Sequence, residues 1–184
     1  MKKRRFGVSS DVRGLDTERI LRVFAALQVD YVLIGGLAAL AHGSTIATAD
    51  AYVLPRLDTT NLEGLLDALE ELGAAILISE QRLAMEAGPA WEATELNDRG
   101  AEALAAANAW HFTTDAGPID VVVRVTGVGP YEAHMSGAED RAAFGVRIRV
   151  AGLGDLISSK EATGRPKDEA ILKDLRELRE QGIN

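Results

Sequence analysis

The sequence predicts an α/β fold (α+β in stricter usage) in which helices flank a mixed β-sheet. Short apolar runs with strand character, such as Tyr31–Ile34, alternate with segments that have a helical apolar stripe. A hairpin is expected where Trp110–Thr114 and Ile119–Val125 flank the turn sequence 115–118. Two further helices are expected at the end of the sequence, so the C-terminal region is expected to be helical.

The first half of the chain opens with a helix for which Asp16 is the expected N-cap. Glu18 lies in its first turn, where the helix dipole favours a negative charge, and Arg19 stands where a capping box would have Glu or Gln. The apolar stripe of this helix is Ile20, Val23, Phe24 and Leu27. The next expected elements are a strand at Tyr31–Ile34, a short helix at Leu37–Ala41, a strand at Ala51–Leu54, a helix capped by Thr59 or Thr60 and stopped by Gly73, and a strand at Ala75–Ile78.

The second half begins with residues 80–109, which are rich in Ala and Glu and are expected to form helix and loop. After the first hairpin, residues 131–140 are expected to be helical, and a second hairpin is expected about Gly145 between 142–144 and 146–150. The last two helices are expected at Asp155–Thr163, stopped by Gly164, and at Lys167–Gln181, with Pro166 in the first turn.

Length and composition suit one domain over residues 1–184. A chain of 184 residues can bury a proper core, expected in residues 15–151, with the C-terminal helices in 152–184. Hydrophobic residues make up 47% of the chain but aromatic residues only 5%. The core must therefore be built mainly from Leu, Val, Ile and Ala.

Charge and cysteine content exclude several classes of protein. The chain has no Cys, which excludes disulfides, thiolate metal sites and a Cys nucleophile, and it fits a reducing cytoplasm. A net charge of −8 argues against a protein that coats nucleic acid by broad phosphate neutralisation. No apolar core follows the basic N-terminus, and no run approaches the ~18 apolar residues of a membrane span.

The strand Tyr31–Ile34 ends in the pair Gly35-Gly36, at the start of a small-residue helix. Two glycines there can bring backbone N–H groups against a phosphate, because no Cβ obstructs the approach. Paired glycines also mark simple tight turns, so this pair alone leaves both interpretations open.

Two carboxylates stand at the starts of apolar strands. Asp50 precedes the run AYVL, and Asp120 lies within IDVVV, where a neutral residue would be buried at lower cost. Each could be a simple strand cap. Together they fit a shared Mg²⁺ (or Mn²⁺) site, because Mg²⁺ takes one or two carboxylates, several waters and phosphate oxygens.

The glycine pair followed by Asp50 and Asp120 resembles the nucleotidyltransferase superfamily of the DNA polymerase beta type. The small bacterial members found as abortive-infection toxins look most similar. Their pattern is Gly-Gly or Gly-Ser at a strand end, Asp-x-Asp on the next strand and a third carboxylate on a later strand. The resemblance implies a nucleotidyltransferase fold and metal binding by Asp50 and Asp120, which would be catalytic together with Lys160.

This chain departs from the pattern at two positions. Tyr52 stands where the second Asp of Asp-x-Asp is expected, and Ile46 stands where many relatives carry Arg. Tyr52 either fills an inner face in a domain that has lost catalysis, or contacts the nucleotide through its ring or hydroxyl. Ser44 and Thr48 are turn or cap residues or bind the nucleotide, and Thr48 could orient a phosphate or a metal-bound water.

A cationic cluster lies between the last two helices. A charge cluster is usually a solvated face, but the resemblance implies that Lys160 reaches the nucleotide phosphates. Arg165 and Lys167 would support the triphosphate or an RNA acceptor, and Asp168 or Asp174 would fix the geometry of the cations.

The histidines and serines point to no further chemistry. His42, His111 and His134 have no metal-ligand spacing, and His42 is expected to anchor a loop by a backbone hydrogen bond. Ser158 and Ser159 have no companions for a hydrolase triad.

The leading interpretation is Mg²⁺-dependent transfer of an NMP from an NTP to an acceptor hydroxyl. The acceptor would be an RNA 3′ end (such as tRNA) or a protein, as in the toxins of bacterial toxin–antitoxin systems; a small molecule also fits. The protein would be cytoplasmic, with an antitoxin partner and no membrane contact. The alternative is a catalytically impaired nucleotide-binding or interaction domain on the same fold.

Overall fold

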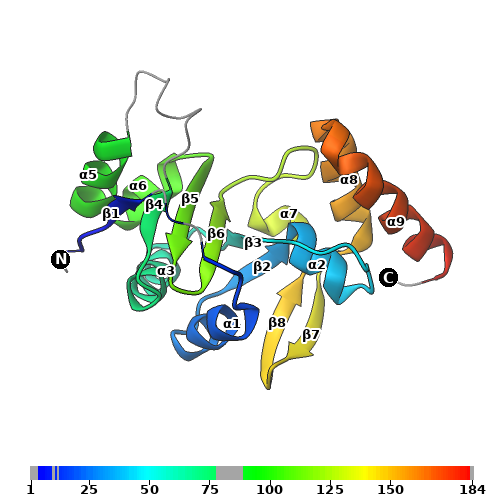
Figure 1. Cartoon of the computed structure of the whole chain (residues 1–184), viewed down its shortest axis with the longest axis horizontal. Helices are drawn as coiled ribbons and strands as arrows, with labels where there is room; N and C mark the ends of the chain where they lie inside the picture. The colour runs from blue at the N-terminus through cyan, green and yellow to red at the C-terminus, as the bar shows by residue number, and fades with distance from the viewer. Residues whose placement is uncertain (1–3, 10, 12, 78–88, 183–184) are drawn as a thin grey trace.

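A computed structural model describes residues 4–9, 11, 13–77 and 89–182, and within these the chain is a mixed α/β protein built on one eight-stranded sheet (Figure 1). In spatial order the strands are β1 (Gly7–Ser9), β4 (Ala75–Leu77), β5 (Ala109–Thr114), β6 (Gly117–Val122), β3 (Ala51–Pro55), β2 (Tyr31–Ile34), β8 (Val146–Val150) and β7 (Glu139–Ala143).

The sheet mixes parallel and antiparallel pairs. The pairs β1–β4, β6–β3 and β2–β8 are parallel, and the other neighbours are antiparallel. The expected mixed sheet is confirmed, and so is the hairpin about residues 115–118, in which Thr114 pairs with Gly117. The centre of the sheet is therefore β5–β6–β3–β2, the strands that carry the glycine pair and both carboxylates.

The helices of the described residues cover the sheet and its ends. They are α1 (Thr17–Ala26), α2 (Gly35–Ala41), α3 (Thr59–Glu71), α5 (Pro89–Arg99), α6 (Ala101–Ala106), α7 (Tyr131–His134), α8 (Leu153–Thr163), the 3₁₀ turn η1 (Pro166–Asp168) and α9 (Glu169–Glu180). The helix α1 contacts α3 and β8, whereas α2 contacts β2, β3 and α8. Figure 1 shows α8 and α9 at the end of the molecule opposite to β1 and α5. None of the described helices is long and apolar enough to cross a membrane.

Several expected element boundaries are wrong. The helix expected over 131–140 is only α7, because residues 139–143 pair with β8 as the edge strand β7. Asp58, not Thr59 or Thr60, caps α3: its side chain accepts a hydrogen bond from the Asn61 N–H at 3.0 Å. The strand β1 was not expected, and it places sheet residues before the core start proposed at residue 15. The expected strand residue Ile78 lies outside the described residues.

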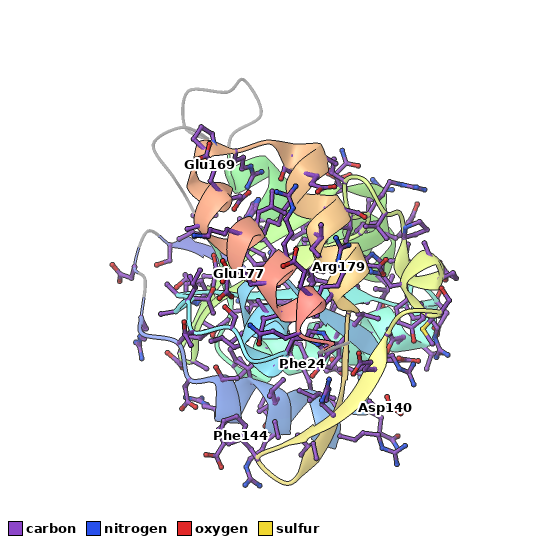
Figure 2. The ribbon with its side chains drawn as sticks, turned by 90° about the vertical axis from the view of Figure 1, so that its right-hand side faces the viewer. Phe24, Asp140, Phe144, Glu169, Glu177 and Arg179 are labelled. Carbon is purple, nitrogen blue, oxygen red and sulfur yellow. The ribbon has the colours of Figure 1, made fainter. Side chains whose placement is uncertain are left out.

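The core is one cluster of buried side chains, mostly Leu, Val, Ile and Ala, as composition predicts. Several of its few aromatic side chains contact one another: the ring centroids of Phe24 and Tyr31 are 5.3 Å apart, and that of Phe112 lies 5.9 Å from Phe6 and 6.4 Å from Trp110. Figure 2 shows the β7–β8 hairpin with Phe144 near its tip, where the ring is 47% exposed.

Two buried polar side chains hold the elements around the sheet centre. Asn61 accepts a hydrogen bond from the Asp30 N–H and donates to the carbonyls of Asp30 and Arg56 at 2.8 and 2.7 Å. It thereby joins the start of β2 to the end of β3. His42 Nε2 lies 2.8 Å from the Ala151 carbonyl, which ties the end of α2 to the segment before α8. This confirms the expected loop-anchoring role of His42.

Candidate functional site

The turn from β2 into α2 has no room for side chains at its glycines. Gly35 has a φ of +66°, a conformation that favours glycine, and a Cβ there would lie 3.3 Å from the Tyr52 ring. A Cβ on Gly36 would lie 2.5 Å from the Cβ and Oγ1 atoms of Thr48. The glycine pair therefore lets Tyr52 and Thr48 approach the backbone closely. Its phosphate-binding role stays a prediction.

The carboxylates Asp50 and Asp120 both act on Tyr52. In the parallel β3–β6 pair Tyr52 is the register partner of Asp120, and Asp50 lies two residues before Tyr52, directly before β3. Burial raises the pKa of the Tyr52 phenol, and the charges of Asp120 and then Asp50 raise it further. The structure thus brings both predicted carboxylates to one tyrosine.

Asp120 is buried and has a second partner. It is 7% exposed and is the register partner of His111 in the antiparallel β5–β6 pair. His111 Nδ1 lies 2.5 Å from Asp120 Oδ1. His111, Asp120 and Tyr52 therefore form a row across β5, β6 and β3. Metal-ligand spacing did not identify His111. The expected hairpin, with residues 115–118 as its turn, would have paired 114 with 119 and placed His111 opposite Val122, whereas the observed pairing of 114 with 117 places it opposite Asp120.

Thr48 and Ser44 shape the loop between α2 and β3. The Thr48 hydroxyl donates a hydrogen bond to Asp50 Oδ1 at 2.8 Å, so Thr48 orients this carboxylate. Ser44 is buried, and its hydroxyl accepts a hydrogen bond from the Ile46 N–H at 3.2 Å. The structure therefore gives Ser44 a turn-forming role, whereas Thr48 belongs to the carboxylate group.

Within the cationic segment, Arg165 is the residue whose charge acts on Tyr52. Arg165 is exposed, and its charge acts on the Tyr52 phenol in the direction that lowers the phenol pKa, opposite to the larger effects of burial and Asp120. Lys160 Nζ instead lies 2.9 Å from Oδ1 of the buried Asp168, and its expected contact with nucleotide phosphates stays a prediction. Lys167 lies in η1, and its side chain is outside the described part of the structure.

The donor set fits one hard cation. Mg²⁺ takes one or two carboxylates and completes its shell with waters and phosphate oxygens. Asp50 and Asp120 meet that requirement for one ion. A second ion would need further acidic ligands, and among the described residues no group of three or more His, Asp or Glu side chains could hold a metal.

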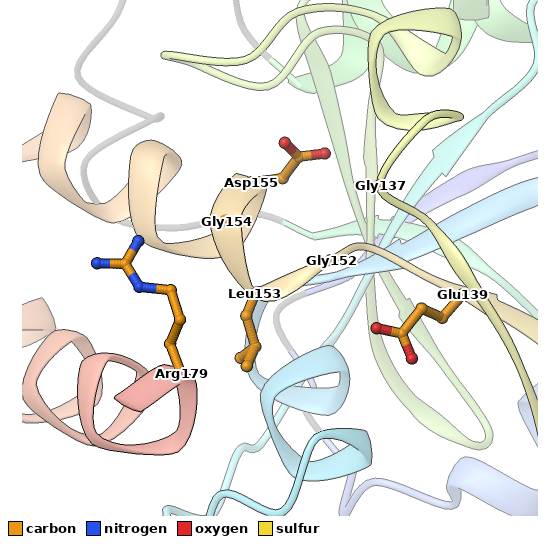
Figure 3. A pocket seen from close by; sticks show the side chains of 7 residues that line it. All are labelled: Gly137, Glu139, Gly152, Leu153, Gly154, Asp155 and Arg179. Atoms are coloured by element: carbon orange, nitrogen blue, oxygen red, sulfur yellow. The ribbon is translucent and has the colours of Figure 1, made fainter. Parts of the chain in front are cut away.

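The detected hollow lies elsewhere, at the N-terminal end of α8 (Figure 3). It has a volume of about 270 Å³, and its charged side chains are Glu139, Asp155 and Arg179. Glu139 already pairs with Arg141, and Asp155 Oδ2 lies 2.9 Å from Nδ1 of the buried His134. The hollow contains none of the predicted site residues, so it does not bear on the carboxylate site.

Comparisons with known proteins identify no relative. No protein-family model matches the chain, and a search of curated proteins finds no similar sequence.

Proposed function

We propose that this chain is a nucleotidyltransferase-type protein that binds an NTP with one divalent cation, Mg²⁺ or Mn²⁺, and transfers its NMP to an acceptor hydroxyl. The observation that supports the proposal best is the meeting of Asp50 and Asp120 at Tyr52, beside the glycine turn after β2. This arrangement has the element order of the nucleotidyltransferase fold that the sequence resembles.

The roles of the residues follow from their positions. Asp50, oriented by Thr48, and Asp120 would hold the cation, which when bound neutralises phosphate charge as a Lewis acid. The backbone at Gly35 and Gly36 would face the phosphates. Arg165, which reaches the Tyr52 environment, would pair with phosphate oxygens together with Lys160 and Lys167.

The reaction needs positioning more than covalent chemistry from the protein. The acceptor oxygen forms a bond to the α-phosphorus while the bond to pyrophosphate breaks, and the hydroxyl proton leaves to solvent. Tyr52 contributes a neutral donor where the resemblance places a carboxylate, so this site holds less negative charge than a two-ion site requires. We therefore expect slow or acceptor-restricted transfer.

The acceptor and partners are proposed from the resemblance. An RNA 3′ end, such as that of tRNA, or a protein side chain would accept the NMP, with the chain acting as the toxin of a cytoplasmic bacterial toxin–antitoxin pair. The exposed Arg165 next to the carboxylate group is the feature that suits an RNA phosphate.

A second candidate function is nucleotide binding without catalysis. It is favoured by the surroundings of Asp120, whose carboxylate already accepts a hydrogen bond from His111 and lies opposite the neutral Tyr52 phenol. Such a carboxylate is stabilised by protein donors and needs no cation for its charge to be tolerated in a buried position.

Labelled NTPs distinguish these functions. The parent protein is incubated with Mg²⁺ or Mn²⁺, each labelled NTP, and total bacterial RNA or protein. The one-ion transferase predicts slow NMP incorporation that Tyr52→Asp increases and Asp50→Ala abolishes. Asp98→Ala, which removes an exposed carboxylate on α5, is the charge-matched control and should leave incorporation unchanged. Incorporation in neither the parent nor Tyr52→Asp, with NTP affinity retained, would establish the binding module instead.

A further inference from the structure

His111 is held against Asp120 by a short hydrogen bond within the sheet. The two residues are register partners in β5–β6, and His111 Nδ1 lies 2.5 Å from Asp120 Oδ1. An ionised carboxylate can only accept hydrogen bonds, so Nδ1 carries the proton and donates it. The bond fixes both the imidazole ring and one oxygen of the carboxylate.

The two residues differ in their exposure to solvent. The Asp120 side chain is 9% exposed, whereas the His111 side chain is 40% exposed. The ring of His111 therefore contributes little to the apolar core, and its conspicuous interaction is with the carboxylate. A side chain with this placement can be replaced without leaving a core cavity.

Asp120 keeps capacity for another partner. A carboxylate offers about four lone-pair positions, and of the register partners of Asp120 on its two neighbouring strands, His111 donates a hydrogen bond to it and Tyr52 lies on the other side. The bond from His111 restrains the rotation of the carboxylate on the face that carries Tyr52. Outer partners of this kind orient ligating groups in metal sites.

We infer that His111 is a positioning residue for the nucleotide-bound cation, acting through Asp120 and not through direct contact. The inference depends on the proposed function, because it assigns His111 a part in that same site. The Nδ1–H group is the feature that matters, since it is the group that contacts the carboxylate.

Three substitutions separate this role from a general structural one. His111→Asn places an amide nitrogen at the same number of bonds from the backbone as Nδ1 and can keep the donor. His111→Gln places its amide nitrogen one atom further out, and His111→Ala has no donor. The affinity of each protein for Mn²⁺ is measured by electron paramagnetic resonance with and without each NTP, and folding is checked by denaturant titration.

The expected result is an approximately 10- to 100-fold loss of Mn²⁺ affinity for His111→Ala and His111→Gln, with His111→Asn close to the parent. Equal Mn²⁺ affinity in the parent and His111→Ala would overturn the role of His111 alone. A parent protein that binds no Mn²⁺ with any NTP would overturn the proposed function itself. Nitrogen-15 NMR of the imidazoles gives an independent check: a His111 ring protonated only at Nε2 would overturn the inference whatever the nucleotide result.

Discussion

Tyr52 lies directly opposite Asp120 across the parallel β3–β6 pair, where burial and then the charge of Asp120 raise the pKa of the Tyr52 phenol. An ionised carboxylate only accepts hydrogen bonds, so the neutral phenol is the group of this pair that can donate one. Like charges at directly opposite positions in a sheet are destabilising, whereas a neutral donor stabilises a buried carboxylate. The tyrosine therefore gives the buried Asp120 a neutral partner. An aspartate at position 52 would be tolerated opposite Asp120 only if a cation lay between the two carboxylates. We therefore expect the residue at position 52 to determine whether this pair of side chains needs a metal.

Tyr52→Asp should make the stability of the protein depend on divalent cations. Without a cation the variant loses the neutral phenol beside the buried Asp120 and gains a like charge, which should lower the free energy of unfolding by roughly 1–3 kcal/mol. Mg²⁺ or Mn²⁺ at about 100 times its Kd should restore about 2.7 kcal/mol. Denaturant unfolding with and without cation measures both effects. Tyr52→Phe is the control, and equal cation dependence in both variants would contradict the prediction.

The three tyrosines should ionise only at unusually high pH in the folded protein. Burial raises the pKa of Tyr31, burial and Asp120 raise that of Tyr52, and burial and Asp30 raise that of Tyr131. Phenolate absorbance should therefore begin to rise well above pH ~10 in the folded protein, and near pH ~10 in denaturant. A folded-state component that titrates at the ordinary value would contradict these burial arguments.

The same raised pKa values determine whether the free energy of unfolding rises or falls at alkaline pH. Above pH ~10 the unfolded phenols lose protons that the folded ones keep, so the unfolded state binds fewer protons and the free energy of unfolding falls as pH rises. Below pH ~10 the stabilisation that the raised tyrosine pKa values contribute is fully present. Tyr52→Phe should make the fall shallower, which unfolding at pH 8 to 11 would show.

Gly36→Ala should destabilise the fold even in the absence of nucleotide. The new methyl group would lie 2.5 Å from Thr48 Cβ, so the loop before β3 must shift, at a cost of about 1–3 kcal/mol. Gly154→Ala is the matched control, because a Cβ there meets no atom within 4 Å. The two variants are compared by denaturant unfolding. Equal free energies of unfolding for Gly36→Ala and Gly154→Ala would mean that the packing of Thr48 does not require glycine at position 36.

Lys160→Met should weaken NTP binding while leaving nucleoside binding unchanged, if Lys160 reaches the phosphates. Loss of a charged hydrogen bond corresponds to about 1.5–3 kcal/mol of binding free energy. Asp168→Asn is the companion variant: it breaks the 2.9 Å ion pair but keeps the lysine charge, so NTP affinity should be retained. Calorimetric titration checks this. If both variants lose stability and neither loses NTP affinity, Lys160 only stabilises the junction of α8 and η1.

Local patterns in the sequence were sufficient for the central elements. The apolar run Tyr31–Ile34, the glycine pair and the turn about 115–118 specify strands and turns over a few residues, because period and turn chemistry act locally. The position of Asp50 directly before a strand follows from the same local signals, whereas Asp120, which was expected at a strand start, is the fourth residue of β6. The strand β1 does not follow from local signals, because it exists through pairing with β4, which lies far away in the sequence. The hairpin about Gly145 does follow from them, and only the extension of β7 to residues 139–141 was not expected.

The sequence by itself determined which side chains could do chemistry: a glycine turn, Asp50, Asp120, and the cations Lys160 and Arg165. Only the tertiary structure decided their partners. The register of the sheet places Tyr52 and His111 on the two strands that neighbour Asp120. The packing of α8 against η1 brings Lys160 into an ion pair with Asp168. The reason is physical: side-chain pairing across strands and helices depends on contacts between residues remote in sequence, and no local propensity encodes those contacts.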